Sequence, residues 1–197
     1  MEEFANNPAQ PKETGTSFSA VRTAVMNWTR DLLIAMGLAA VIIVFLYQPV
    51  KVEGTSMSPL LTDQERIFIN KFVYRFEPIQ RGDVVVFWYP LDRTKSFIKR
   101  VIAIPGDLVE IRNGRVLVNG KALDEPYVPP QFADHGSHSP TRVPDGQFFV
   151  LGDHRNSSND SRVFGPVPGQ FIYGKAVFVY WPVERFGALP TFDGELQ

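Results

Sequence analysis

The longest apolar stretch of the chain runs from Leu32 to Tyr47, and its sixteen residues carry no charge. Gln48, Pro49 and Val50 extend the uncharged run to nineteen residues. A helix that crosses the hydrocarbon core of a bilayer needs roughly 17–25 mostly apolar residues. The stretch therefore predicts one membrane-spanning helix, and we assign residues 31–50 to this anchor.

Two other kinds of segment could be this apolar. A cleaved signal peptide has a shorter apolar region that ends in a small-x-small site, and residues 45–49 (Phe-Leu-Tyr-Gln-Pro) make a poor site. A helix in the core of a soluble protein rarely lacks a polar face over sixteen residues. An uncleaved anchor is therefore favoured over both alternatives.

Charges on either side of the anchor indicate its orientation. Arg22 and Arg30 precede it, whereas only Lys51 follows it closely. The positive-inside rule then predicts an N-terminus in the cytoplasm (or stroma) and an exported domain at residues 51–197. The sequence does not distinguish a plasma membrane from a thylakoid membrane.

Composition excludes several functions. The formal net charge is −1, so the chain has no electrostatic footprint for nucleic acid. It contains no cysteine, which rules out disulfides, thiolate catalysis and thiolate metal sites. His135 and His138 have no apolar neighbours and are interpreted as solvated loop residues, not metal ligands. Residues 1–30 are expected to form a cytoplasmic tail, disordered over residues 1–17, which show no apolar period.

Beyond residue 50 the chain consists of short runs rich in β-branched and aromatic residues, separated by turn residues. Such runs predict β-strands. They lie at 67–74, 83–89, 96–104, 108–112, 115–118, 147–151 and 171–181. Asn113 and Gly114 join two of them and are typical of a two-residue hairpin, because both turn positions need a positive φ.

The predicted fold is therefore mainly β, with a coiled antiparallel sheet or barrel-like domain behind one N-terminal transmembrane helix. No stretch beyond residue 50 has a convincing helical period. Residues 126–146 contain five prolines and few apolar residues. We expect them to form a long surface loop or insertion.

Ser56 lies in a short polar segment, about half a dozen residues past the anchor. Taken alone, it could be an ordinary turn serine that precedes Pro59. A serine paired with a desolvated lysine is, however, a known alternative to the serine–histidine pair of hydrolases. Ser56 is therefore a candidate nucleophile if a suitable lysine lies near it.

Lys99 is the candidate base. An alternating strand pattern puts Phe97, Lys99 and Val101 on one face, while Arg100 on the other face can point to solvent or to a carboxylate. Burial among apolar side chains disfavours the ammonium form, so the lysine can supply a neutral amine near neutral pH. An edge-strand lysine that maintains solubility is the alternative interpretation.

Residues 152–162 form a polar loop directly after the predicted strand 147–151. The loop contains hydroxyl groups that could orient a lysine amine, and Asp and Arg residues that could brace it through charged hydrogen bonds. Its composition alone favours a mobile Asn- and Ser-rich loop.

Together, these segments resemble the ordered sequence boxes of the type I signal peptidases, which use a serine and a lysine. The resemblance runs from the anchor to about residue 180, and it rests on four boxes in the family's order. The boxes are Gly54-x-Ser56-Met57-x-Pro59, Arg81-Gly82-Asp83, Lys99 to Asp107 (Lys-Arg-Val-Ile-Ala-Ile-Pro-Gly-Asp), and Gly152-Asp153-x-Arg155-x-x-Ser158-x-Asp160-Ser161-Arg162.

The resemblance implies a single-spanning bacterial or thylakoid enzyme with Ser56 as nucleophile and Lys99 as general base. The hydroxyl that orients the lysine falls on Ser158. Residues that brace the last box fall on Asp153, Arg155, Asp160 and Arg162. Candidates for the shallow apolar pockets that receive the substrate are Val52, Met57, Leu61 and Ile98.

The implied substrates are preproteins whose N-terminal signal peptides carry small residues at −3 and −1 to the cut. The implied surroundings are the lipid bilayer and the neighbourhood of the export machinery. No metal or organic cofactor is implied, and no nucleic acid.

Two positions depart from the family pattern. Some members have at position 54 a serine whose hydroxyl helps to hold the oxyanion, but Gly54 has no hydroxyl. The oxyanion hole must then rely on backbone N–H groups such as that of Ser56. His154 stands where asparagine is common, and we interpret it as a loop-packing residue, not as a base.

Two other functions use part of the same pattern. A self-cleaving, repressor-type serine–lysine protease would need an N-terminal DNA-binding helix pair and an internal Ala-Gly cleavage site, and the sequence has no Ala-Gly pair. A non-catalytic anchored β module would leave Ser56, Lys99 and the 152–162 loop without a role. A further hypothesis makes Phe87-Trp88-Tyr89-Pro90 an apolar tip that dips into the membrane interface; a core strand is its alternative.

Overall fold

The computed structural model describes residues 18–192, and the chain divides into two compact units, residues 1–42 and residues 43–197. The disorder predicted for residues 1–17 lies outside the described residues. The described part of the first unit belongs to the helix α1 (Phe18–Leu46). Within it, Val21–Val41 is long and apolar enough to cross a membrane by length and composition.

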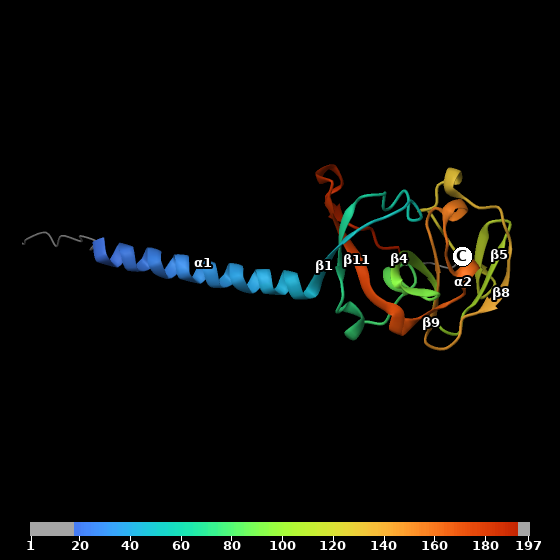
Figure 1. The fold of residues 1–197 in the computed structure, drawn as a ribbon, viewed down its shortest axis with the longest axis horizontal. Helices are drawn as coiled ribbons and strands as arrows, with labels where there is room; N and C mark the ends of the chain where they lie inside the picture. Colours follow the sequence, from blue (N-terminus) through green and yellow to red (C-terminus); the bar gives the residue numbers. More distant parts are fainter. Residues whose placement is uncertain (1–17, 193–197) are drawn as a thin grey trace, which may run out of the picture. The chain divides into compact units, whose positions relative to one another are not determined.

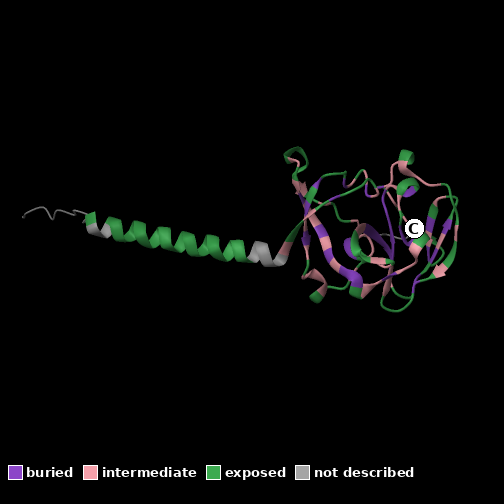
Figure 2. Cartoon of the chain, viewed as in Figure 1, coloured by how far each residue is buried: buried purple, intermediate pink, exposed green. Residues whose placement is uncertain are grey.

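Apolar side chains are exposed all along the part of α1 whose burial is described, and Figure 2 shows it as exposed throughout. The helix differs from the predicted span of residues 31–50 at both ends. It begins earlier, because the charged residues Arg22, Arg30 and Asp31 are compatible with a helix. It ends at Leu46, because Pro49 favours extended backbone before it and cannot donate a helical hydrogen bond.

The second unit is mainly β, as predicted, and its strands form two antiparallel sheets (Figure 1). The larger sheet has the order β1-β2-β11-β3-β4-β9-β10, with β12 paired to β11. Its strands are β1 (Tyr47–Lys51), β2 (Arg66–Asn70), β3 (Val84–Tyr89), β4 (Asp92–Ala103), β9 (Gln147–Leu151), β10 (Val167–Pro168), β11 (Ile172–Trp181) and β12 (Gly187–Ala188). Its outermost strands, β1 and β10, do not pair with each other in the described part of the chain, so the expected barrel-like sheet is not a closed barrel.

The smaller sheet has the order β7-β6-β5-β8. It consists of β5 (Leu108–Arg112), β6 (Arg115–Val118), β7 (Lys121–Ala122) and β8 (His138–Arg142). The predicted hairpin joins β5 to β6, and Asn113 and Gly114 adopt φ values of 49° and 80°. A side chain at Gly114 would collide with the backbone carbonyl of Asp134, so glycine is required there.

The segment 126–146 is more ordered than a surface loop. It contains the short helix η2 (Pro130–Phe132) and the strand β8, which pairs with β5. Tyr127 and Val143 are buried. The prolines of this segment argue against a strand when the sequence is read alone. β8 lies at the edge of its sheet, where proline is tolerated because no ladder hydrogen bond has to be donated.

Short helical turns connect the remaining strands. They are η1 (Val73–Arg75), η3 (Arg155–Ser157), α2 (Ser161–Phe164), η4 (Gly169–Phe171) and η5 (Val183–Arg185). One cluster of buried residues includes Val52, Met57 and Leu61 together with residues of β2, β3 and β11. This cluster fixes the backbone on both sides of Ser56 to the larger sheet, and it thereby positions the site.

Candidate active site

Ser56 lies in a tight connection between β1 and β2. The connection begins where Val52 N–H donates to the Glu65 carbonyl (2.7 Å), and it turns where Ser58 N–H donates to the Thr55 carbonyl (2.9 Å). Gly54 has a φ of 90°, a value that favours glycine, and its N–H donates to Asp63 Oδ1 (2.8 Å). The connection is therefore held at both ends, and Ser56 is presented at its centre.

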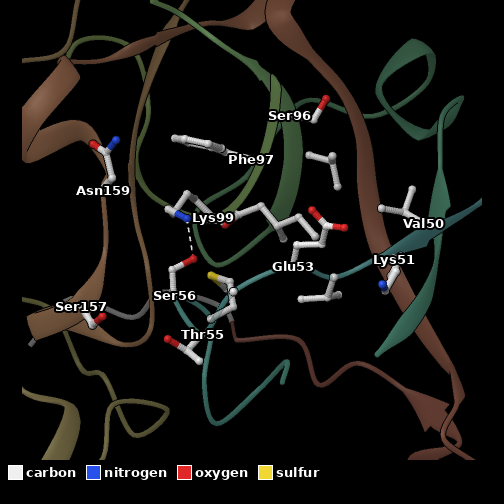
Figure 3. A pocket seen from close by; sticks show the side chains of 15 residues that line it. Val50, Lys51, Glu53, Thr55, Ser56, Ser96, Phe97, Lys99, Ser157 and Asn159 are labelled. Carbon is white, nitrogen blue, oxygen red and sulfur yellow. Dashed lines mark hydrogen bonds between the residues drawn. The ribbon is translucent and has the colours of Figure 1, made fainter. Parts of the chain in front are cut away.

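Lys99 comes from β4, where it pairs in register with Val85 of β3. Its side chain is 4% exposed. The Nζ atom lies 2.7 Å from Ser56 Oγ and 2.9 Å from the carbonyl oxygen of Ile98, to which it donates a hydrogen bond. The dashed line in Figure 3 marks the contact between Nζ and Oγ. The structure thus brings together the two residues that the sequence predicts as nucleophile and base.

Burial changes the acidity of this lysine. Desolvation lowers the pKa of Lys99 from 10.5 to about 8, although the nearby carboxylates of Asp160 and Asp153 act in the opposite direction. A substantial neutral fraction is therefore present at mildly alkaline pH. A neutral amine at hydrogen-bond distance from a hydroxyl can accept its proton, which is the requirement for a general base.

A cleft of about 380 Å³ opens beside this pair. Of the predicted pocket residues, Val52, Met57 and Ile98 line it, but Leu61 does not, since it is fully buried in the core. Figure 3 shows Val50 and Lys51 on one side of the Lys99–Ser56 pair, and Ser157 and Asn159 on the other. The lining residues that the sequence argument missed are Val50, Lys51, Glu53, Thr55, Val86, Ser96, Phe97, Ser157 and Asn159.

Alternation along β4 could have indicated Phe97 beside Lys99. Val50 lies two residues before Val52, so the same alternation could have indicated it.

The 152–162 loop is fixed to the sheet by a buried ion pair. Arg100 donates to both carboxylate oxygens of Asp153, at 2.9 and 2.6 Å, and neither side chain is exposed to solvent. Arg100 also donates to the Gly82 carbonyl (3.0 Å) and lies over the Tyr127 ring, 4.0 Å from its centroid. The sequence pattern left two environments for Arg100, solvent or a carboxylate, and in the structure Arg100 binds the carboxylate of Asp153. The pairing anchors the loop at the residue that follows Gly152.

Two more arginines brace the loop. Arg162 binds Asp160 (2.8 Å), which also caps α2 by accepting from the Arg162 backbone N–H, and it binds Asp134 (2.8 Å). Arg155 donates to Glu125, with one contact at 3.0 Å. The sequence argument missed Glu125 and Asp134, because both are remote in sequence from the loop that they contact.

Ser158 does not reach Lys99 through a hydrogen bond in this structure. Its Oγ is buried and has no hydrogen-bond partner within residues 18–192. It lies close to Gly152, where a Cβ atom would collide with Ser158 Oγ and with the Ser56 carbonyl oxygen. The absence of a side chain at Gly152 therefore lets the loop approach the nucleophile.

His154 contacts the nucleophile segment directly. Its backbone N–H donates to the Ser56 carbonyl (3.1 Å), and its Nδ1 lies 3.1 Å from the Thr55 carbonyl oxygen. Its ring lies against that of Phe132, with 4.2 Å between the centroids. The residue therefore packs against η2, outside its own loop, and it contacts the backbone on both sides of the Ser56 Cα atom. Within residues 18–192, no cluster of three or more His, Asp and Glu side chains could hold a metal ion.

Comparison with known proteins places this site in a family. A family model described as signal peptidase, peptidase S26, matches residues 25–181. The probable signal peptidase I-1 of Synechocystis sp. is 42% identical over 170 residues, covering 82% of this chain and 85% of that protein. Signal peptidase I of Leptolyngbya laminosa is 38% identical over 192 residues (92% and 91%), and signal peptidase I of Bacillus amyloliquefaciens is 36% identical over 170 residues (82% and 90%). The chain therefore belongs to the signal peptidase family, peptidase S26.

Proposed function

We propose that the chain is a membrane-bound serine endopeptidase that removes N-terminal signal peptides from exported preproteins, with Ser56 as nucleophile and Lys99 as general base. The main support is the 2.7 Å contact between Ser56 Oγ and the Nζ of a buried lysine whose pKa is lowered to about 8. Membership of the signal peptidase family supports the substrate class.

The proposed reaction has two steps. Neutral Lys99 accepts the Ser56 hydroxyl proton while Oγ attacks the scissile carbonyl carbon, and the lysine then gives that proton to the leaving amine. The product is an ester between Ser56 and the signal peptide. In the second step Lys99 accepts a proton from water, the resulting hydroxide attacks the ester, and the proton returns to Ser56 Oγ as the signal peptide leaves.

The oxyanion that forms in each step needs a hydrogen-bond donor. We assign this role to the backbone N–H of Ser56, since Gly54 has no hydroxyl and its own N–H is bound to Asp63. A single preorganised donor of this kind is worth about 2.7–4 kcal/mol in well-studied hydrolases.

The shape of the cleft supports a preference for small side chains near the cut. Val52, Met57 and Val86 are buried, so each contributes only a small surface to the wall of the cleft. The other apolar lining residues are Val50, Phe97 and Ile98. A small side chain can enter between these walls, whereas a large one would have to displace core residues. Ser158 stays a proposed orienting residue for Lys99, because its buried hydroxyl has no hydrogen-bond partner within residues 18–192.

Anchoring by α1 would hold the site at the membrane surface. We propose that α1 spans the bilayer with its N-terminus in the cytoplasm or stroma, and that residues 51–197 form the exported catalytic domain. Of the residues expected in the apolar tip, Trp88, near the end of β3, is 42% exposed, whereas Phe87 is buried in the core. Leu91, in the β3–β4 turn, is 72% exposed and adds to the exposed apolar surface there.

The test compares purified full-length variants in detergent, with a preprotein as substrate. Wild type should cut once, after a small-x-small site, and both Ser56→Ala and Lys99→Ala should abolish the cut. Two matched controls, Ser139→Ala and Lys95→Ala, change an exposed serine and an exposed lysine and should leave the rate unchanged. Full activity in Ser56→Ala or Lys99→Ala would refute the assigned pair.

A further inference from the structure

His154 binds the peptide groups on both sides of the nucleophile. Its ring Nδ1 contacts the carbonyl oxygen of Thr55, and its backbone N–H donates to the carbonyl oxygen of Ser56, each at 3.1 Å. A carbonyl oxygen can only accept, so the ring is bound through an Nδ1–H group. One residue therefore restrains the backbone before and after the Ser56 Cα atom.

The contact with Thr55 also determines where the Ser56 N–H points. The Thr55 carbonyl and the Ser56 N–H belong to one planar trans peptide unit, so they point in opposite directions. A ring that holds the carbonyl toward the 152–162 loop thus turns the N–H away from that loop. Thr55 and Ser56 both line the cleft, where the scissile carbonyl would be bound.

We propose that His154 is a positioning residue that aims the Ser56 N–H at the oxyanion through its Nδ1–H bond to Thr55. The proposal rests on the proposed role of Ser56 as nucleophile and oxyanion donor. It assigns His154 no proton transfer and no contact with the substrate.

The surroundings of His154 make it a firm support. Asp153, the preceding residue, is locked in the fully buried pair with Arg100, so the loop cannot follow a displaced Thr55 carbonyl. The N–H of Ser58 also donates to that carbonyl (2.9 Å), so the oxygen accepts two hydrogen bonds. Without the ring, the Thr55 carbonyl would accept only the hydrogen bond from the Ser58 N–H.

The missing hydroxyl at Gly54 increases the importance of this alignment. An oxyanion hole with two converging donors tolerates some misdirection of either one. Here the Ser56 N–H is the donor assigned to the oxyanion, so an error in its direction is not compensated by residue 54. Small displacements matter, since a shift of about 1 Å can reduce a rate by about 100-fold.

Three substitutions separate this role from simple packing. His154→Phe keeps a ring that can stack on Phe132 but removes the Nδ1–H donor. His154→Asn replaces the ring by an amide whose N–H₂ group can bind the Thr55 carbonyl. Phe132→Ala removes the stacking partner and leaves the hydrogen bond.

Full-length proteins are assayed in detergent with a preprotein, and kcat, KM and the thermal midpoint are measured. We expect His154→Phe to lower kcat by about 10- to 100-fold, below the ~10²–10³ for loss of a complete oxyanion donor, with KM and the midpoint little changed. His154→Asn should keep kcat within about threefold of wild type, and Phe132→Ala should leave kcat unchanged. Wild-type kcat in His154→Phe, or an equal loss in Phe132→Ala, would overturn the proposal.

Inhibitor binding supplies an independent measurement. A peptide aldehyde forms a tetrahedral hemiacetal with the serine, and its oxygen occupies the oxyanion site, so its affinity should fall in His154→Phe by the same factor as kcat/KM. Unchanged aldehyde affinity beside a reduced kcat would also contradict the proposal. Ser56→Ala serves as the separate control, since activity in that variant would refute the proposed nucleophile, whatever the behaviour of the His154 variants.

Discussion

Lys99 has a function that conflicts with its surroundings. Its amine lies in a site that is 4% exposed, where an ammonium ion loses most of its hydration. The carboxylates of Asp160 and Asp153 oppose the resulting fall in pKa, so the amine reaches a pKa of about 8 instead of a lower value. Desolvation and the two carboxylates therefore act in opposite directions on the same amine, whose protonation state the proposed mechanism depends on.

This pKa predicts the pH dependence of cleavage. If the neutral amine is the base, as proposed, kcat/KM should rise with pH and level off above a midpoint near 8. The profile of purified wild-type enzyme with a preprotein gives the midpoint directly. Asp160→Asn removes a charge that raises the pKa of Lys99, so its profile should move to lower pH. A shift to higher pH would contradict this account of the site.

At the level of elements, β4 combines two environments in one strand. Its first residues are exposed near the β3–β4 turn, and its last residues, from Lys99 to Ala103, are buried between β3 and β9. The same strand therefore connects the exposed end of the sheet with Lys99, the proposed base, and with Arg100, which anchors the 152–162 loop.

The β3–β4 turn provides a prediction for membrane contact. Trp88 and Leu91 are exposed apolar residues, and burying them in the interface of a bilayer would be favourable. A double change, Trp88→Glu and Leu91→Glu, should weaken binding of the full-length protein to liposomes or slow cleavage in lipid, while cleavage in detergent stays normal. Trp181→Glu is the matched control, since Trp181 is 52% exposed at the other end of β11. Equal effects of the two changes would sink the proposed contact.

Local sequence patterns predict the fold well where contacts are local. Asn113-Gly114 makes the expected hairpin, and the expected mainly β domain is present. Strand β8 was missed because its prolines and polar residues become a strand only by pairing with β5, thirty residues away in sequence. Leu61 was misplaced because its spacing from Ser56 does not reveal that it turns into the core.

The residues of the site were likewise predictable only where a sequence pattern identifies them. The pairing of Ser56 with Lys99 was predicted through the family's boxes, since the two residues are far apart in the chain. Glu125 and Asp134 escaped prediction because their arginine partners lie 30 and 28 residues away and nothing in the local sequence identifies them. The contacts of His154 with Thr55 and Ser56 span about a hundred residues, so only the folded chain displays them.

The whole molecule bears the free-energy cost of the buried lysine. Below pH 8 the ammonium form must be buried in the native state, whereas in the unfolded chain it is solvated and keeps its ordinary pKa of 10.5. The unfolded state therefore binds more protons between pH 8 and 10.5, and wild-type stability rises with pH through that window. At about 1.4 kcal/mol per pKa unit, the penalty at pH 7 is about 3 kcal/mol.

Lys99→Met should remove this penalty. At pH 7 the free energy of unfolding of the variant should be about 3 kcal/mol larger than that of wild type. This pH-dependent part of the difference should vanish above pH 10.5. Denaturant titrations at several pH values in detergent measure it. Lys95→Met, a change at an exposed lysine of the same strand, should show no such dependence. An advantage for Lys99→Met that is constant with pH would contradict the assigned burial of charge.

The strand order has a consequence for biosynthesis. In the larger sheet β11 lies between β2, which follows the nucleophile, and β3, which precedes the base. During synthesis Ser56 and Lys99 leave the ribosome early, but β11 is completed only at Trp181. A growing chain therefore carries both reactive groups without the strand that joins their halves of the sheet. If Ser56 and Lys99 act as proposed, proteolytic competence arises only after β11 has been synthesised.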